Sequence, residues 1–259
     1  MDFEAKNRAQ NRTDKPSLAE MTASAIRLLS HGSNGFFLLV EGGMMDSALH
    51  DNKAKLAFEE VKSFHAAVET ALNMTDPENT LVVVTADHSH SLSLVMFPRR
   101  NVSILGTFRG VKSADALPWS LLSFADGPSA VLYHPNGTRR RNLTGIDTEA
   151  LDFQQPAFIP ASKESHGGED VAVYAQGPFS HLFTGVYEQN YIAHAMAHAL
   201  CLHHQQDSLI SMPENQGSHT PIILWIAVAC LCLVVLFLVV TLINLRRKFS
   251  AHASAAEHG

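Results

Sequence analysis

The strongest constraint on the fold is a pair of short apolar runs separated by a helical pattern. The run FFLLV occupies residues 36–40, and the run LVVVT occupies residues 81–85. Short, uninterrupted apolar runs are typical of strands that are buried on both faces. Residues 52–74 lie between them and carry apolar side chains three to five positions apart, which indicates a helix. The order strand, helix, strand predicts a right-handed crossover between parallel strands of an α/β sheet.

A further helix is predicted before the first apolar run. Residues 16–35 begin with Ser17 followed by Glu20, which is the spacing of a capping box. The helical pattern ends in a turn rich in Gly and Asn, where the backbone can leave the helix. We therefore expect this helix to end just before the first strand.

The composition is that of a folded protein and gives no reason to expect nucleic acid as a partner. The 259 residues are 46% hydrophobic and 17% charged, with a formal net charge of -6. The basic run Arg139 to Arg141 lies among turn-forming residues, so we interpret it as a solvated loop.

A long apolar segment near the C-terminus predicts a membrane-spanning helix. As a helix, residues 222–243 would be roughly 33 Å long at ~1.5 Å per residue, enough to cross a hydrocarbon core of ~30 Å. Arg246, Arg247 and Lys248 follow at once, whereas the preceding flank has no Lys or Arg. The positive-inside rule predicts a single-pass protein of the cell membrane with an extracellular or luminal N-terminal domain. The expected segments are a linker at 206–221, the transmembrane helix at 222–245 and a cytosolic tail at 246–259.

Glycosylation sequons agree with that orientation. Cys230 and Cys232 lie in the apolar segment, so the predicted N-terminal domain contains no second cysteine that could form a disulfide with Cys201. The N-terminus is polar and has no apolar core of a signal peptide, so we expect the chain to be the C-terminal part of a longer protein of the secretory pathway. The predicted glycosylation sites are Asn11, Asn73, Asn101, Asn136 and Asn142.

Acidic and histidine side chains follow both predicted strands. The carboxyl ends of parallel strands meet at the edge where open α/β sheets bind ligands. Another histidine precedes a third strand-like run, and the glycines after it let the backbone approach closely. Aspartate and histidine together suit zinc, although a polar loop that contains histidine by chance is the alternative. The candidates are Glu41, Asp46, His50, Asp87, His88 and His166, whereas we interpret His65, His194, His198, His203 and His204 as surface or core residues.

These motifs together resemble the C-terminal half of animal alkaline phosphatases. The resemblance rests on GFFLLVEGG with Asp46 and His50, on TADHSH, and on ESHGGEDVAVYAQGP with HLFTGVYEQNYIAHAMAHAL, and it runs from about residue 1 to residue 202. It implies a partial alkaline-phosphatase-like α/β sandwich, with a central, largely parallel sheet flanked by helices. It divides the chain into core segments at 1–96 and 161–205, the second with a final helix near 188–202, and a crown-like surface insertion at 97–160.

The resemblance also implies a set of metal ligands. Two zinc ions and one magnesium ion serve the family, in which zinc clamps the attacking and leaving oxygens of phosphoryl transfer to and from a serine. His90 is expected to support the site or the fold and not to bind zinc. The implied ligands are Asp46, His50 and His166 for the first zinc, Asp87 and His88 for the second zinc, and Glu41 for magnesium.

Two departures from the family pattern bear on activity. The nucleophilic serine and the substrate-binding arginine of the family have no match in this chain, and neither Ser33 nor Ser47 has the setting of a nucleophile after a strand. In the loop EGGMMDSALH, the family's arginine and two of its histidines are replaced by Met44, Ser47 and Leu49. Because such neighbours orient metal ligands, we expect lower metal affinity or turnover.

Two functional hypotheses follow from the sequence. The first is an alkaline phosphatase that depends on zinc and magnesium and hydrolyses phosphomonoesters through a phosphoserine, with this chain inactive alone. The second is a non-catalytic, membrane-anchored glycoprotein or partner subunit that keeps part of the metal site. A homodimer is compatible with either hypothesis. A glycolipid anchor near Gly217 or Ser218 is the alternative to the transmembrane helix.

Overall fold

The computed structural model describes residues 2–12, 14–108, 113–130 and 140–202, and its helices and strands belong to one unit, Met1–Leu200. No helix within these described ranges is both long and apolar enough to cross a membrane. The predicted linker, transmembrane helix and cytosolic tail, residues 206–259, lie outside the described residues.

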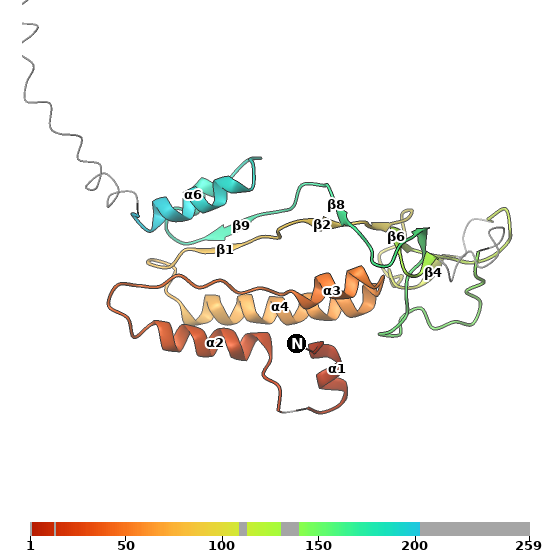
Figure 1. The fold of residues 1–259 in the computed structure, drawn as a ribbon, viewed down its shortest axis with the longest axis horizontal. Coiled ribbons are helices and arrows are strands. Elements are labelled where there is room, and N and C mark those ends of the chain that lie inside the picture. The colour runs from red at the N-terminus through yellow and green to blue at the C-terminus, as the bar shows by residue number, and fades with distance from the viewer. Residues whose placement is uncertain (1, 13, 109–112, 131–139, 203–259) are drawn as a thin grey trace, which may run out of the picture. The chain divides into compact units, whose positions relative to one another are not determined.

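A group of helices surrounds one long helix. Helix α4 (Ala54–Met74) packs against α1 (Glu4–Ala9), α2 (Leu18–Leu29) and α3 (Met44–His50), as Figure 1 shows. Buried side chains recur along one face of α4, where they meet these neighbours. The predicted helix at 52–74 is thereby confirmed.

Helix α2 begins where the sequence predicts. The Ser17 hydroxyl accepts a hydrogen bond from the Glu20 amide at 3.2 Å, and the Glu20 carboxylate accepts one from the Ser17 amide at 2.7 Å. This reciprocal pair satisfies two amides that the first turn leaves without helical partners. The predicted capping box is confirmed.

The strands are short and form four small sheets. In the three-stranded sheet, β6 lies between β3 and β7. A 3₁₀ turn (Ser180–Phe183) and a last helix, α6 (Asn190–Ala199), follow the strands. The strands are β1 (Val82–Val84), β2 (Ser89–His90), β3 (Leu92–Leu94), β4 (Thr107–Phe108), β5 (Trp119–Ser120), β6 (Leu122–Gly127), β7 (Ala157–Pro160), β8 (His166–Gly167) and β9 (Tyr174–Gln176).

The predicted, largely parallel sheet is wrong for the described strands. Strand β1 pairs antiparallel with β9, and β2 pairs antiparallel with β8. Among the described strands, β6 and β7 alone form a parallel pair. The reason is that the chain leaves β1 toward β2 and returns alongside both in the opposite direction, as Figure 1 shows. The two pairs therefore behave as one antiparallel ribbon that is interrupted between them.

The first apolar run does not form a strand. Residues 36–40 have irregular backbone structure, and none of their backbone groups hydrogen-bonds to another described residue. Burial alternates along the run, so that Phe37 is 58% exposed and Leu39 is 75% exposed. The prediction of a strand buried on both faces is wrong here, because a strand needs a ladder partner and the described part of the chain offers none.

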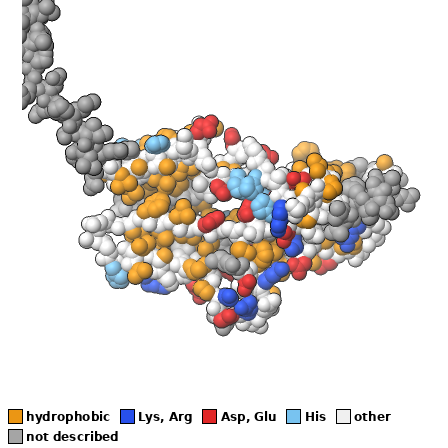
Figure 2. Space-filling model, in the orientation of Figure 1, with side chains coloured by type: hydrophobic (Ala, Val, Ile, Leu, Met, Phe, Trp, Pro, Cys, Tyr) orange, Lys and Arg blue, Asp and Glu red, His pale blue; other side chains and the backbone are white. Residues whose placement is uncertain are grey.

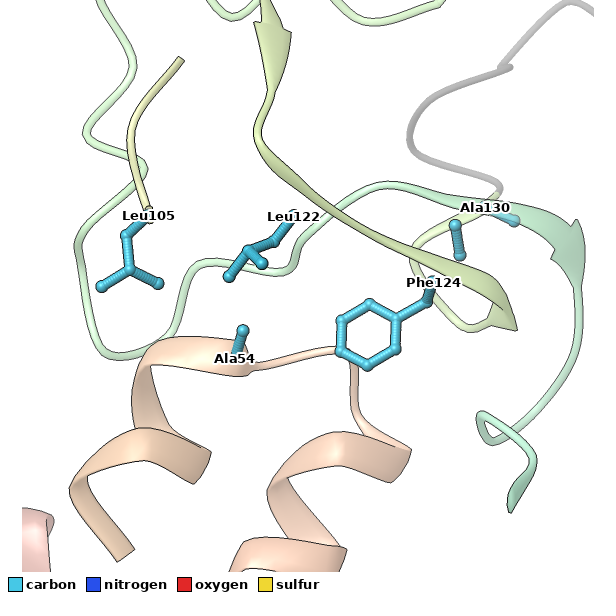
Figure 3. Close-up of a cluster of buried hydrophobic side chains, with 6 residues drawn as sticks. Ala54, Leu105, Leu122, Phe124 and Ala130 are labelled. Carbon is cyan, nitrogen blue, oxygen red and sulfur yellow. The ribbon is translucent and has the colours of Figure 1, made fainter. Parts of the chain in front are cut away.

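Two apolar clusters hold the helices and the β6 sheet together. Phe124 and Leu122 of β6 pack on Ala54 at the start of α4, with Leu105 and Ala130 beside them, as Figure 3 shows. The second cluster lies between α1, α3 and α4 and comprises Ala5, Ala48, Leu56 and Ala57. Because Leu49 of α3 packs against both clusters, this helix is fixed between them.

Truncating Phe124 should strongly destabilise the fold. The side chain is 1% exposed, so Phe124→Ala should lower the free energy of unfolding by about 3–5 kcal/mol through lost contacts and a residual cavity. The control is Phe97→Ala, because Phe97 is 100% exposed and its loss should change stability by about 0.5 kcal/mol or less. Urea unfolding of both variants measures this, and similar losses would contradict the packing described here.

The Glu59 carboxylate on α4 should make the free energy of unfolding depend on pH in the acid range. Hydrogen bonds from Lys62 and Lys55 lower the pKa of Glu59 from 4.5 to about 2. A depressed folded-state pKa contributes stability above the unfolded-state pKa, and that contribution is lost as pH falls from about 4.5 toward 2. Glu59→Gln should therefore be less stable than the unmodified chain at pH 7 and equally stable near pH 2. A stability difference between the two proteins that stays constant from pH 7 to pH 2 would contradict the lowered pKa of Glu59.

Candidate metal centre

The interrupted ribbon places histidines from distant parts of the sequence side by side. His90 of β2 lies directly opposite His166 of β8, and Ser89 lies opposite Gly167. A Cβ atom on Gly167 would overlap the Ser89 hydroxyl and the Glu169 carboxylate and would lie 3.0 Å from the His90 backbone oxygen, so glycine favours this approach. The prediction that the glycines after His166 allow close backbone approach is confirmed for Gly167, whereas a Cβ atom on Gly168 would meet no atom within 4 Å.

Helix α3 supplies an aspartate and a histidine to the same place. Asp46 and His50 are four residues apart and share one face of the helix. The Asp46 Oδ1 atom lies 3.3 Å from His50 Nε2 and 3.5 Å from His166 Nε2. The two histidine Nε2 atoms are 3.2 Å apart. Figure 2 shows histidine side chains gathered beside carboxylates on this face of the molecule.

This triangle of atoms has the dimensions of a zinc site. Ligands at about 2.0–2.1 Å from a tetrahedral zinc ion lie roughly 3.3 Å from one another. The three separations among Asp46, His50 and His166 run from 3.2 to 3.5 Å. An oxygen and two imidazole nitrogens are also the donor types that zinc accepts. The predicted ligands of the first zinc therefore fit the ion in both spacing and chemistry.

Glu164, which no sequence motif singled out, orients two of the histidines. Its side chain is fully buried, and its Oε1 atom accepts a hydrogen bond from the Ser91 amide at 2.6 Å. Its Oε2 atom lies 2.6 Å from His90 Nδ1, and its backbone oxygen lies 2.6 Å from His50 Nδ1. A histidine that donates from Nδ1 presents Nε2 as a ligand atom, which is how metal-binding histidines are usually oriented.

His90 lies inside the cluster. Its ring is only 8% exposed, and its Nε2 atom is 3.0 Å from Asp46 Oδ1. We expected a supporting residue, but the geometry makes His90 a candidate ligand as well. In the sequence, the position of His90 two residues after His88 at a strand end was the signal that could have indicated a further ligand. Potential ligand atoms lie within 4.8 Å of one another in two groups, Asp46, His88, His90 and His166, and His50, His90 and Glu164.

Of the predicted ligands of the second zinc, His88 lies within the cluster and Asp87 lies at its edge. The His88 ring stacks on the His166 ring with centroids 3.4 Å apart. Asp87 Oδ2 is 3.3 Å from His88 Nε2, which is again the spacing of two ligands on one ion. The Asp87 carboxylate is 78% exposed, while its backbone oxygen accepts a hydrogen bond from Gln189. This pair is therefore open to further ligands.

Glu41 faces a different environment. It lines a cavity of about 200 Å³ together with Glu4 and Glu60 near the start of α3. Burial raises the pKa of Glu60, although the Ala5 amide donates a hydrogen bond to its carboxylate. Within the described residues, no hydrogen bond or ion pair joins the Glu41 carboxylate to the histidine cluster. Its assignment to magnesium stays a prediction.

The remaining histidines lie away from the cluster where they are described. His65 on α4 and both His194 and His198 on α6 are exposed, as expected for surface residues. His203 and His204 lie outside the described residues.

Comparison with known proteins identifies the family. The sequence pattern of the alkaline phosphatases matches residues 2–202. The chain belongs to the alkaline phosphatase family. It is 41% identical to the tissue-nonspecific alkaline phosphatase of Gallus gallus over 222 residues, which cover 85% of this chain and 42% of that protein. It is 42% identical to alkaline phosphatase 4 of Drosophila melanogaster over 200 residues, which cover 73% of this chain and 34% of that protein.

The resemblance inferred from the motifs is thereby confirmed at the level of the alkaline phosphatase family. The chain spans about two fifths of the length of the curated relatives that it matches. Among solved structures, a mutant TAB5 alkaline phosphatase with magnesium bound aligns over 78% of this chain and 44% of that chain, with 24% identity and a TM-score of 0.48.

Replacing the buried carboxylate should destabilise the cluster. Glu164→Gln keeps the side-chain size but replaces one acceptor oxygen by an NH2 donor that faces a donor on His90 or Ser91, which should lower the free energy of unfolding by about 1–3 kcal/mol. Glu169→Gln is the matched control, because Glu169 is exposed and its partner, the Ser89 hydroxyl, can donate or accept. Equal urea midpoints for the two variants would show that the Glu164 contacts do not stabilise the fold.

Proposed function

We propose that this chain is the metal-binding C-terminal portion of an alkaline phosphatase, which in the complete protein hydrolyses phosphomonoesters through a phosphoserine. The observation that carries the proposal is the triangle of ligand atoms from Asp46, His50 and His166, with separations of 3.2–3.5 Å. Membership of the alkaline phosphatase family supports the same reaction class.

The proposed first zinc site is held in place by its neighbours. His50 Nδ1 lies 2.6 Å from the Glu164 backbone oxygen, which fixes the ring with Nε2 toward Asp46. His166 is carried by β8, whose pairing with β2 sets its distance from α3. In the proposed second site, Asp87 and His88 bind zinc, with His90 as a further candidate ligand. Glu41 is the proposed magnesium ligand.

The metals and the protein have separable roles in this proposal. When bound, zinc supplies Lewis-acid stabilisation to the attacking and leaving oxygens of an in-line phosphoryl displacement. The residues of this chain hold and orient the ligand atoms, and Glu164 keeps two imidazole rings in the required tautomer. The nucleophilic serine and the substrate-binding arginine belong to the part of the family fold that this chain does not match. Ser33 is exposed in the turn after α2 and does not follow a strand, so it lacks the setting of the family's nucleophile.

The run at residues 36–40 has the features of a strand whose pairing partner belongs to another part of the family fold. Its backbone groups have no hydrogen-bond partner among the described residues, and Phe37 and Leu39 are exposed. An added strand would satisfy these groups and cover the apolar side chains. We therefore expect the portion that supplies the serine to pair here.

We also propose a membrane-anchored glycoprotein with its N-terminal domain outside the cell or in a lumen. The support is the apolar segment at 222–243 with basic residues after it. A glycolipid anchor and a homodimer stay as predictions. Four of the five predicted glycosylation sites, Asn11, Asn73, Asn101 and Asn142, are exposed, and Asn136 lies outside the described residues.

One observation favours the second candidate function, a non-catalytic partner subunit. Leu49 stands where the family pattern has a histidine, and its side chain packs against both apolar clusters. This position therefore contributes to the core and offers no support to a metal ligand. Such a chain would keep part of the metal site for structural reasons.

A fusion experiment tests the proposed function. The full chain should not hydrolyse a chromogenic phosphomonoester at alkaline pH with zinc and magnesium, because it lacks the nucleophile. Fused to the unmatched N-terminal portion of the Gallus gallus relative, it should gain turnover. In the fusion, His166→Ala should abolish turnover, whereas the matched control His194→Ala, at an exposed position on α6, should keep it.

Two results would contradict the proposal. Turnover by the unfused chain that His166→Ala abolishes would place a nucleophile within these 259 residues. A folded fusion without turnover would favour the non-catalytic alternative.

A further inference from the structure

The end of helix α3 is fixed by one buried asparagine. Asn52 follows the helix with a φ of 58°, a left-handed conformation that Asn tolerates better than most residues, and it is fully buried. Its side-chain amide donates to the Asp126 backbone oxygen at 3.0 Å, and its Oδ1 atom accepts from the Ser129 amide at 3.1 Å. Its backbone oxygen accepts from the Gln155 amide at 2.8 Å.

Strand β6 is shaped to receive this side chain. A Cβ atom on Gly127 would lie 2.2 Å from Asn52 Oδ1, and the φ of Gly127 is 135°. Glycine is therefore required both for the backbone conformation and for the approach of the asparagine. The contact is specific to the Asn52 side chain and does not arise from apolar packing alone.

The contact continues to the segment that carries Glu164 and His166. Asp126, whose backbone oxygen receives the Asn52 amide, accepts a hydrogen bond from the Ser165 amide at 2.9 Å through its carboxylate. The Glu164 amide donates to the His50 backbone oxygen at 2.9 Å.

Both halves of the first proposed zinc site meet at this junction. Asp46 and His50 lie on α3, whose C-terminal end Asn52 fixes. His166 lies immediately after Ser165, which Asp126 fixes. A shift of α3 against this segment would change the separation of the His50 and His166 Nε2 atoms, which is 3.2 Å.

We propose that Asn52 is a positioning residue of the metal centre, which acts through Asp126 to hold the segment at 163–166 against helix α3. This inference rests on the proposed function, because it assigns Asn52 a role at the proposed zinc site. Asn52 does not touch the ligand atoms and acts only by fixing the two elements that carry them. Its loss should therefore weaken metal binding more than an equally buried change elsewhere in the same hydrogen-bond network.

The test measures zinc affinity of the full chain by competition with a chromogenic chelator. Asn52→Gly keeps the left-handed backbone conformation and removes the side-chain hydrogen bonds, so it should weaken zinc binding roughly 10-fold to 100-fold. The matched control is Ser120→Ala, because the buried Ser120 hydroxyl donates to Gln155 Oε1 at 2.8 Å, away from the segment at 163–166. This control should leave zinc affinity unchanged.

A second measurement needs no metal. Hydrogen exchange of the metal-free chain should be faster at the Ser165 and Glu164 amides in Asn52→Gly, because the segment loses its anchor. The same amides should be unaffected in Ser120→Ala.

The outcomes separate this inference from the proposed function. If the unmodified chain binds no zinc, the proposed function fails and the inference fails with it. If the unmodified chain and Asn52→Gly bind zinc equally, the inference is overturned and the proposed function stands. If Asn52→Gly and Ser120→Ala lose the same affinity, general destabilisation accounts for the effect and the positioning role is overturned.

Discussion

The pairing of β2 with β8 is the constraint on which the candidate site depends. This ladder is only two residues long, yet it sets His90 against His166 across 76 positions of sequence. Gly167 favours the approach, since a Cβ atom there would overlap the Ser89 hydroxyl and the Glu169 carboxylate as they are placed. The interruption between this pair and the β1–β9 pair leaves Asp87 and His88 free of ladder contacts at the strand end. The predicted ligands Asp87 and His88 thus lie where the ribbon is interrupted, next to His90 and His166 in the β2–β8 pair.

Local signals in the sequence predicted α2, α4 and most of the candidate site. The capping box fixed the start of α2, and apolar spacing located α4, because both depend on residues close in sequence. The stretch EGGMMDSALH was expected to be a loop, but it contains α3, and helix geometry places Asp46 and His50, four residues apart, on one face. The convergence of Asp46, His50, His88 and His166 follows from strand-end positions and from the family resemblance.

Other features depend on contacts between distant segments and were not predictable from local patterns. The apolar run of β1 indicated a strand but not its antiparallel partner, which lies about ninety residues later. The run at 36–40 has strand composition without a ladder partner among the described residues. Glu164 reads as an ordinary polar residue in the sequence, and only its burial against His90 shows its role. Asn52 was equally inconspicuous, because its partners on β6 and just after it, Asp126 and Ser129, are more than seventy residues away.

We propose that Asp46, His50 and His166 hold a zinc ion, and zinc X-ray absorption of the full chain loaded with one equivalent of zinc tests this proposal. The spectrum should show nitrogen and oxygen ligands at about 2.0–2.1 Å with the multiple scattering of imidazole, and this signal should be lost when His50 and His166 are both replaced by Ala. A sulfur ligand at about 2.3 Å, or a spectrum that the double replacement leaves unchanged, would contradict it.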